Sequence, residues 1–116
     1  MKTLLTAASV LLLPLAAHAD SGWQGECRSA AGRVTAQINP WDDDSQVIVH
    51  ADGRKIYEGI DLVSTFDDKA AVVSFEDTKK EKMTLTIHRR TNEGTLVLNG
   101  REIALRCDVN IVETNE

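Results

Sequence analysis

Histidine, cysteine and aromatic residues are scarce in this sequence of 116 residues. It has two Trp, one Tyr, two Phe, three His and two Cys, and the cysteines do not form a C-x-x-C pair. No serine lies in the G-x-S-x-G setting of an activated nucleophile. The histidines are too few and too scattered to provide the three or four ligands of a zinc site. We therefore expect a protein that is not an enzyme and has no cofactor.

Apolar runs are also missing after the first segment of the chain. Residues 4–15 form a largely apolar run, shorter than the about 20 residues that span a membrane, and Pro14 interrupts it. Lys2 precedes this run, and Ala17-His18-Ala19 follows it with the small-x-small pattern of a cleavage site. The pattern predicts a cleaved signal peptide at residues 1–19, no membrane span, and a periplasmic protein whose residues 20–116 form a single domain.

Basic residues are outnumbered by acidic ones. The chain has 13 Lys and Arg against 18 Asp and Glu, a net charge of −5. Removal of residues 1–19 takes away one Lys and no acidic residue, which leaves −6. A surface of this sign repels nucleic acid and anionic lipid, and it favours a cationic protein as the partner. The sequence leaves the oligomeric state open.

The two cysteines, Cys27 and Cys107, lie near opposite ends of the predicted domain. In an oxidising compartment we expect them to form one disulfide. It would close a loop of about 80 residues, which the chain-entropy model values at about 4.5 kcal/mol. That is a large share of the about 5–10 kcal/mol by which such a domain is stable.

Short segments in which apolar and polar residues alternate follow one another along residues 20–116. This alternation is typical of strands with one buried face, and no window shows a sustained helical period. Asp52-Gly53 and Asn99-Gly100 are dipeptides favoured in two-residue hairpin turns. The pattern predicts an all-β domain, a small antiparallel β-barrel or sandwich of about eight strands. The clearest strands cover residues 23–28, 34–38, 46–51, 54–58, 70–75, 82–89, 95–98 and 101–108.

Two segments are harder to assign, and the strand faces place the cysteines. Asn39-Pro40 is expected to end the second strand, because proline cannot donate to a ladder. Residues 58–69 are either a loop or a short strand. Cys27 shares a face with Trp23, and Cys107 shares one with the apolar residues of the last strand. We therefore expect a buried disulfide that joins the first and last strands, with Trp23 packed beside it.

Two predicted loops combine an aromatic residue with carboxylates. A triple Asp after a Trp lacks the alternate spacing, the Gly and the Glu of a calcium-binding loop, so a solvated turn or a binding surface is the better interpretation, and calcium stays open. We hypothesise that the two loops form one binding surface that combines aromatic and acidic side chains. Its residues are Trp41, Asp42, Asp43 and Asp44 in the first loop, and Phe66, Asp67 and Asp68 in the second.

The layout of the chain resembles the small periplasmic lysozyme inhibitors of the MliC/PliC type. The resemblance is carried by Trp-x-x-x-Cys from Trp23 to Cys27, the short all-β body, and a final strand with six residues between Gly100 and Cys107. It implies an eight-stranded antiparallel barrel that blocks a cationic muramidase. The inhibitory Ser-Gly-x-x-Tyr loop of that family is absent, because Ser21-Gly22 is followed by Trp-Gln-Gly. No inhibitory residue is therefore carried over.

These observations favour a non-catalytic binding or interaction protein. The leading hypothesis is an inhibitor of a basic enzyme such as lysozyme that acts through acidic loops. The alternatives are a small-ligand-binding domain, for which few aromatic residues are present, and a structural β-domain associated with the cell envelope.

Overall fold

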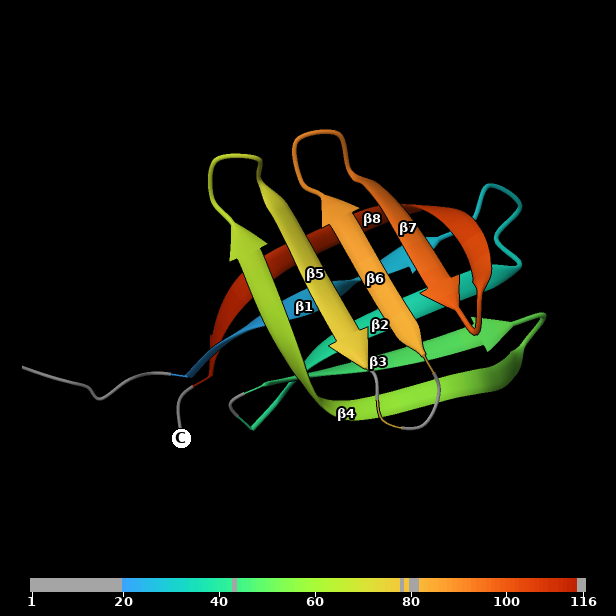
Figure 1. Cartoon of the computed structure of the whole chain (residues 1–116), viewed down its shortest axis with the longest axis horizontal. Helices are drawn as coiled ribbons and strands as arrows, with labels where there is room; N and C mark the ends of the chain where they lie inside the picture. Colours follow the sequence, from blue (N-terminus) through green and yellow to red (C-terminus); the bar gives the residue numbers. More distant parts are fainter. Residues whose placement is uncertain (1–19, 43, 78, 80–81, 115–116) are drawn as a thin grey trace, which may run out of the picture.

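A closed barrel of eight antiparallel strands makes up the fold in the computed structural model (Figure 1). The structure describes residues 20–42, 44–77, 79 and 82–114. The predicted signal peptide and Asp43 lie outside these residues. Each strand pairs with its neighbours in the chain, and the last strand pairs with the first. The prediction of an all-β barrel or sandwich with about eight strands is confirmed, and the barrel is the form that the chain takes.

The strands follow the predicted order, several of them with longer bounds. They are β1 (Asp20–Arg28), β2 (Val34–Trp41), β3 (Asp44–Ala51), β4 (Arg54–Asp67), β5 (Val72–Asp77), β6 (Met83–His88), β7 (Glu93–Leu98) and β8 (Arg101–Thr114).

The tight turns form where the sequence predicts them. Asn99 and Gly100 have φ values of 50° and 84° and join β7 to β8. Two consecutive positive φ values match the right-handed twist of the flanking strands, which is why Asn-Gly is favoured there. The turn places Leu98 directly opposite Arg101. Because Leu98 is buried inside the barrel, Arg101 also begins on the inner side.

Residues 58–69 belong almost entirely to β4, a single strand of 14 residues. The register with β3 slips by one residue at two places, between Ser45 and Val47 and between Val49 and His50. Each slip is a β-bulge, which breaks alternation and bends the strand. A strand with two bulges lacks the regular alternation of apolar and polar residues by which a strand is recognised. The sequence therefore does not decide between a loop and a strand for residues 58–69.

The expected end of β2 at Asn39-Pro40 was wrong, since β2 continues to Trp41. Pro40 lies opposite Ser45 of β3 and is followed by the pair of Trp41 and Asp44. The ladder between β1 and β2 already ends at the pair of Gly25 and Ile38. The missing N–H of proline therefore costs no ladder hydrogen bond on the β1 side.

The disulfide closes the barrel where β1 meets β8. Cys27 and Cys107 are directly opposite each other, and their sulfur atoms are bonded. Both are buried in the core, as the face assignment predicts. A Cβ atom added at Gly94 of β7 would lie 2.5 Å from the Cys107 sulfur, too close for any real contact. Glycine at position 94 thus leaves the space that the disulfide fills.

Candidate functional site

The first predicted binding loop is the short turn between β2 and β3. Trp41 is 38% exposed, and Asp42 is exposed with a φ of 50°. Asp44 begins β3 and is partly buried. Asp43 lies outside the described residues. The Trp41 ring is thus neither a core plug nor fully solvated.

The second predicted loop follows β4. Phe66 is 40% exposed, and Asp68 is exposed. The Oδ1 atom of Asp67 accepts the backbone N–H groups of Lys69 at 3.0 Å and Ala70 at 3.2 Å. This carboxylate therefore holds the turn in shape, a common use of aspartate after a strand.

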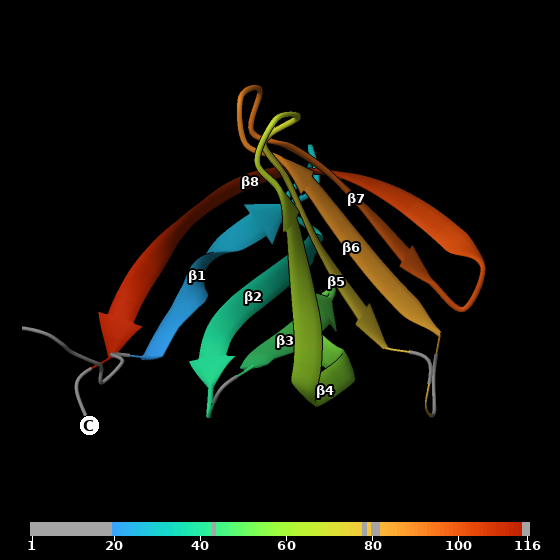
Figure 2. The same ribbon diagram turned by 60° about the vertical axis from the view of Figure 1, so that its left-hand side comes forward.

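The two loops lie at separate corners of the molecule in both ribbon views. The turn between β2 and β3 is at the bottom of Figures 1 and 2, and the turn between β4 and β5 is at the top. Phe66 instead packs against Trp23 of β1, with ring centroids 5.5 Å apart. The structure thus brings Phe66 to Trp23 and leaves Trp41 with other neighbours.

The neighbours of Trp41 follow from the strand register. Trp41 lies opposite Asp44 across the hairpin. The ladder between β3 and β4 ends at the pair of Ser45 and Leu62, and the next residues of the two strands are Asp44 and Val63, which the antiparallel register directs to the same face. Val63 in turn lies opposite Glu76 of β5. A row of alternating apolar and acidic residues therefore crosses four strands on the outside of the barrel.

The second bulge of β4 adds to this row. Ile60 and Asp61 are consecutive and both exposed, and Asp61 has a φ of 56°. Val63 is 62% exposed and Ile60 is 43% exposed, more than most apolar residues of this barrel. We name the combined surface the acid-apolar face; it comprises Trp41, Asp44, Ile60, Asp61, Val63 and Glu76. Within the part of the chain that the structure describes, none of its three carboxylates takes part in an ion pair.

One end of the barrel is filled, and we name it the plugged end. Trp23 is only 7% exposed although it lies near the beginning of β1. Phe66 covers one part of its ring, and the Arg89 guanidinium lies 5.1 Å from the ring centroid. Arg89 also donates to the Val109 carbonyl oxygen at 3.5 Å. The aromatic ring, the cation and the last strand together close this end.

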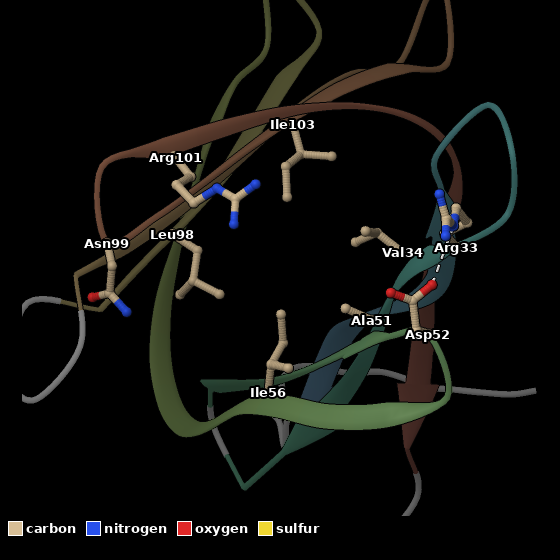
Figure 3. Close-up of a pocket in the computed structure, with 9 residues that line it drawn as sticks. All are labelled: Arg33, Val34, Ala51, Asp52, Ile56, Leu98, Asn99, Arg101 and Ile103. Atoms are coloured by element: carbon tan, nitrogen blue, oxygen red, sulfur yellow. Dashed lines mark hydrogen bonds and ion pairs between the residues drawn. The ribbon is translucent and has the colours of Figure 1, made fainter.

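The other end is hollow, and we name it the open end (Figure 3). A cavity of about 480 Å³ lies between the turns that join β3 to β4 and β7 to β8. Its apolar lining comes from Val34, Ala51, Ile56, Leu98 and Ile103, and its polar lining from Arg33, Asp52, Asn99 and Arg101. The first bulge of β4 makes Ile56 the extra residue next to the inward-facing Tyr57, which turns Ile56 toward the cavity.

The two arginines of the open end have different surroundings. Arg33 Nε donates to Asp52 Oδ1 at 3.2 Å, and both side chains are well exposed. Figure 3 shows the Arg101 guanidinium between Leu98 and Ile103, directed into the cavity. Among the described residues, no carboxylate and no aromatic ring is paired with Arg101.

Comparison with protein-family models, curated proteins and solved structures finds no match for this chain.

Two further features are absent from the described residues. No helix among them is long and apolar enough to cross a membrane. No three of their His, Cys, Asp and Glu side chains are grouped so that they could hold a metal ion.

Sequence patterns did not single out Ile60, Val63 or Arg101. For Arg101 the signal is present, because the alternation that places Ile103 and Leu105 on the inner face places Arg101 there too. For Ile60 and Val63 the sequence contains no such signal. The bulge between them interrupts the alternation of inward-facing and outward-facing residues.

Proposed function

We propose that this chain is a non-catalytic, periplasmic binding protein that holds a cationic protein against the acid-apolar face. The observation that supports it is the row from Trp41 to Glu76, in which exposed apolar side chains alternate with carboxylates that form no ion pair among the described residues. Surfaces that combine an aromatic anchor with polar groups at the rim are typical of protein–protein interfaces. The disulfide is compatible with an oxidising compartment.

Apolar and acidic residues have different tasks in such a complex. Burying the remaining exposed part of Trp41, Ile60 or Val63 contributes about 1 kcal/mol each, since each is already about half-buried. An exposed ion pair contributes about 0.2–1 kcal/mol and is weakened by salt. The apolar residues therefore supply most of the affinity, while the carboxylates select a positively charged partner and speed its approach.

Lysozyme is the first partner to test, because it is basic and because of the resemblance to the periplasmic inhibitors. The exported, oxidised protein is added to lysozyme, and both cell-wall hydrolysis and the dissociation constant are measured. Trp41→Ser/Val63→Ser is expected to weaken binding about thirty-fold, the equivalent of about 2 kcal/mol. Asp44→Asn/Glu76→Gln is expected to lower the association rate and its salt dependence.

A control with equal charge separates this face from net charge. Glu102→Gln/Asp108→Asn removes the same two negative charges from exposed positions of β8 and should leave binding unchanged. Unchanged lysozyme activity at a micromolar excess of the protein rejects lysozyme as the partner. An equal loss of binding in the two charge variants rejects the acid-apolar face.

A further inference from the structure

The open end combines three properties of a small-molecule site. It is concave, it is lined mostly by aliphatic side chains, and part of that lining is in contact with water, since Ile56 is 42% exposed. Its volume of about 480 Å³ falls in the range of about 300–1,000 Å³ typical of small-molecule sites. A ligand that covered these side chains would gain the free energy of removing them from water.

Arg101 gives the hollow a charge. Because Arg101 lies opposite Leu98, its side chain begins on the inner side of the barrel wall, beside aliphatic groups, while the residue stays exposed to water. Arg33, the other arginine of the lining, is already paired with Asp52. One guanidinium is therefore available to an incoming anion, and it can bind a carboxylate through two parallel hydrogen bonds.

We propose that the open end binds a single-chain amphiphile with a carboxylate head group, such as a free fatty acid. The aliphatic chain lies among Val34, Ile56 and Ile103, and the carboxylate is bound by Arg101 at the rim. One unpaired guanidinium matches a head group with one negative charge, which favours a carboxylate over a phosphate. The chain does not enter deeper, because the buried core residues fill the barrel below the hollow.

This site is separate from the proposed protein-binding surface. The acid-apolar face lies on the outer wall, near the turn between β2 and β3, whereas the hollow lies beside the turns at the other end of these strands. The Asp44→Asn/Glu76→Gln variant should therefore bind the amphiphile as the unchanged protein does. Failure of one proposal leaves the other standing.

Titration calorimetry with octanoate, decanoate and dodecanoate, each below its micelle concentration, tests the proposal on the exported, oxidised protein. Each step adds two methylene groups, so the affinity is expected to rise about five- to fifteen-fold per step until the hollow is full. Decanol, which has the same chain without the charge, is expected to bind about ten-fold more weakly than decanoate.

Two variants assign the binding to this end. Arg101→Gln should remove the preference for decanoate over decanol, while the dependence on chain length remains. Arg106→Gln is the matched control, because it removes the same charge from an exposed position of the same strand outside the hollow. Ile56 is 42% exposed, so Ile56→Ser should have little effect on folding. It should weaken the binding of all three carboxylates by the same factor.

Three results would overturn the proposal. They are equal affinities for the three carboxylates, an undiminished preference for decanoate in Arg101→Gln, and an equal effect of Arg106→Gln. Tighter binding of decyl phosphate than of decanoate would assign the hollow to a phosphate ligand and reject the carboxylate.

Discussion

The two ends of this barrel are built to the same plan but completed differently. Each end has an arginine at a position whose side chain begins on the inner face, Arg89 after β6 and Arg101 at the beginning of β8. At the plugged end Arg89 lies over the Trp23 ring, and Phe66 packs beside it. At the open end Arg101 is directed into a hollow that has no aromatic residue in its lining.

The difference shows how a chain with few aromatic residues distributes them. A cation that faces inward is stabilised by a cation–π interaction with the face of an aromatic ring. One large ring can also fill the end of a barrel. The chain places this combination at one end only. At the other end Arg101 is exposed to water and, among the described residues, has no carboxylate or ring partner, and the apolar surface beside it stays unfilled.

The largest expected effect comes from removing the plug. Trp23→Ala should lower the free energy of unfolding by about 3–5 kcal/mol, because it deletes a buried ring and leaves a cavity. Ile103→Ala at the open end should lower it by only about 1–2 kcal/mol, because that side chain already borders a hollow. Urea unfolding followed by far-ultraviolet circular dichroism measures both. Trp41→Ala is the control for residue type and should cost little; equal losses in the two Trp variants would contradict the comparison.

A smaller effect separates the two arginines. Arg89→Leu removes the interaction with the Trp23 ring and should lower the free energy of unfolding by about 1 kcal/mol. Arg101→Leu removes no ion pair or ring contact that the described residues make and adds an apolar group to the hollow, so stability should stay the same or rise. Both variants are compared by thermal unfolding at low and moderate salt. If Arg101→Leu proved the more destabilising, the open end would contain a partner for this cation.

The smallest effect concerns the exposed charges on the outer wall of the open end. Lys55 Nζ donates to Glu58 Oε1 at 2.6 Å, and this hydrogen bond and the charge of Lys55 hold the pKa of Glu58 below its usual value. A lowered carboxyl pKa adds stability above the unfolded-state pKa, and that stability is lost as the pH falls through the folded-state value.

The pair is exposed, so the gain in stability is the least of the three effects. Lys55→Met should raise the pKa of Glu58 toward its ordinary value, as followed by carboxyl carbon chemical shifts against pH. Gln46 donates to the same carboxylate at 3.4 Å and should keep a small part of the shift. A titration curve that the substitution leaves unmoved would remove Lys55 as the cause.

Local patterns predicted the strands and the disulfide well, because alternation and turn dipeptides act over a few residues. Asn99-Gly100 and the faces of Cys27 and Cys107 are examples. The approach of Phe66 to Trp23 could not be predicted in this way, because it depends on how β4 bends across the barrel. The bend comes from the two β-bulges, and no turn dipeptide in the sequence of β4 indicates where they lie. The same bulges create the acid-apolar face and turn Ile56 into the hollow.

The closing pair of strands also gives the folding reaction an order. All other strand pairs join neighbours in the chain, so they require only short loops to close, while β1 and β8 meet from opposite ends of the sequence. The disulfide lies in this one long-range pair. The disulfide therefore links the two strands whose pairing makes the barrel a closed ring. If the barrel opens between β1 and β8, the disulfide still holds these two strands together. If it opens between two strands that are neighbours in the chain, β1 and β8 stay paired and linked.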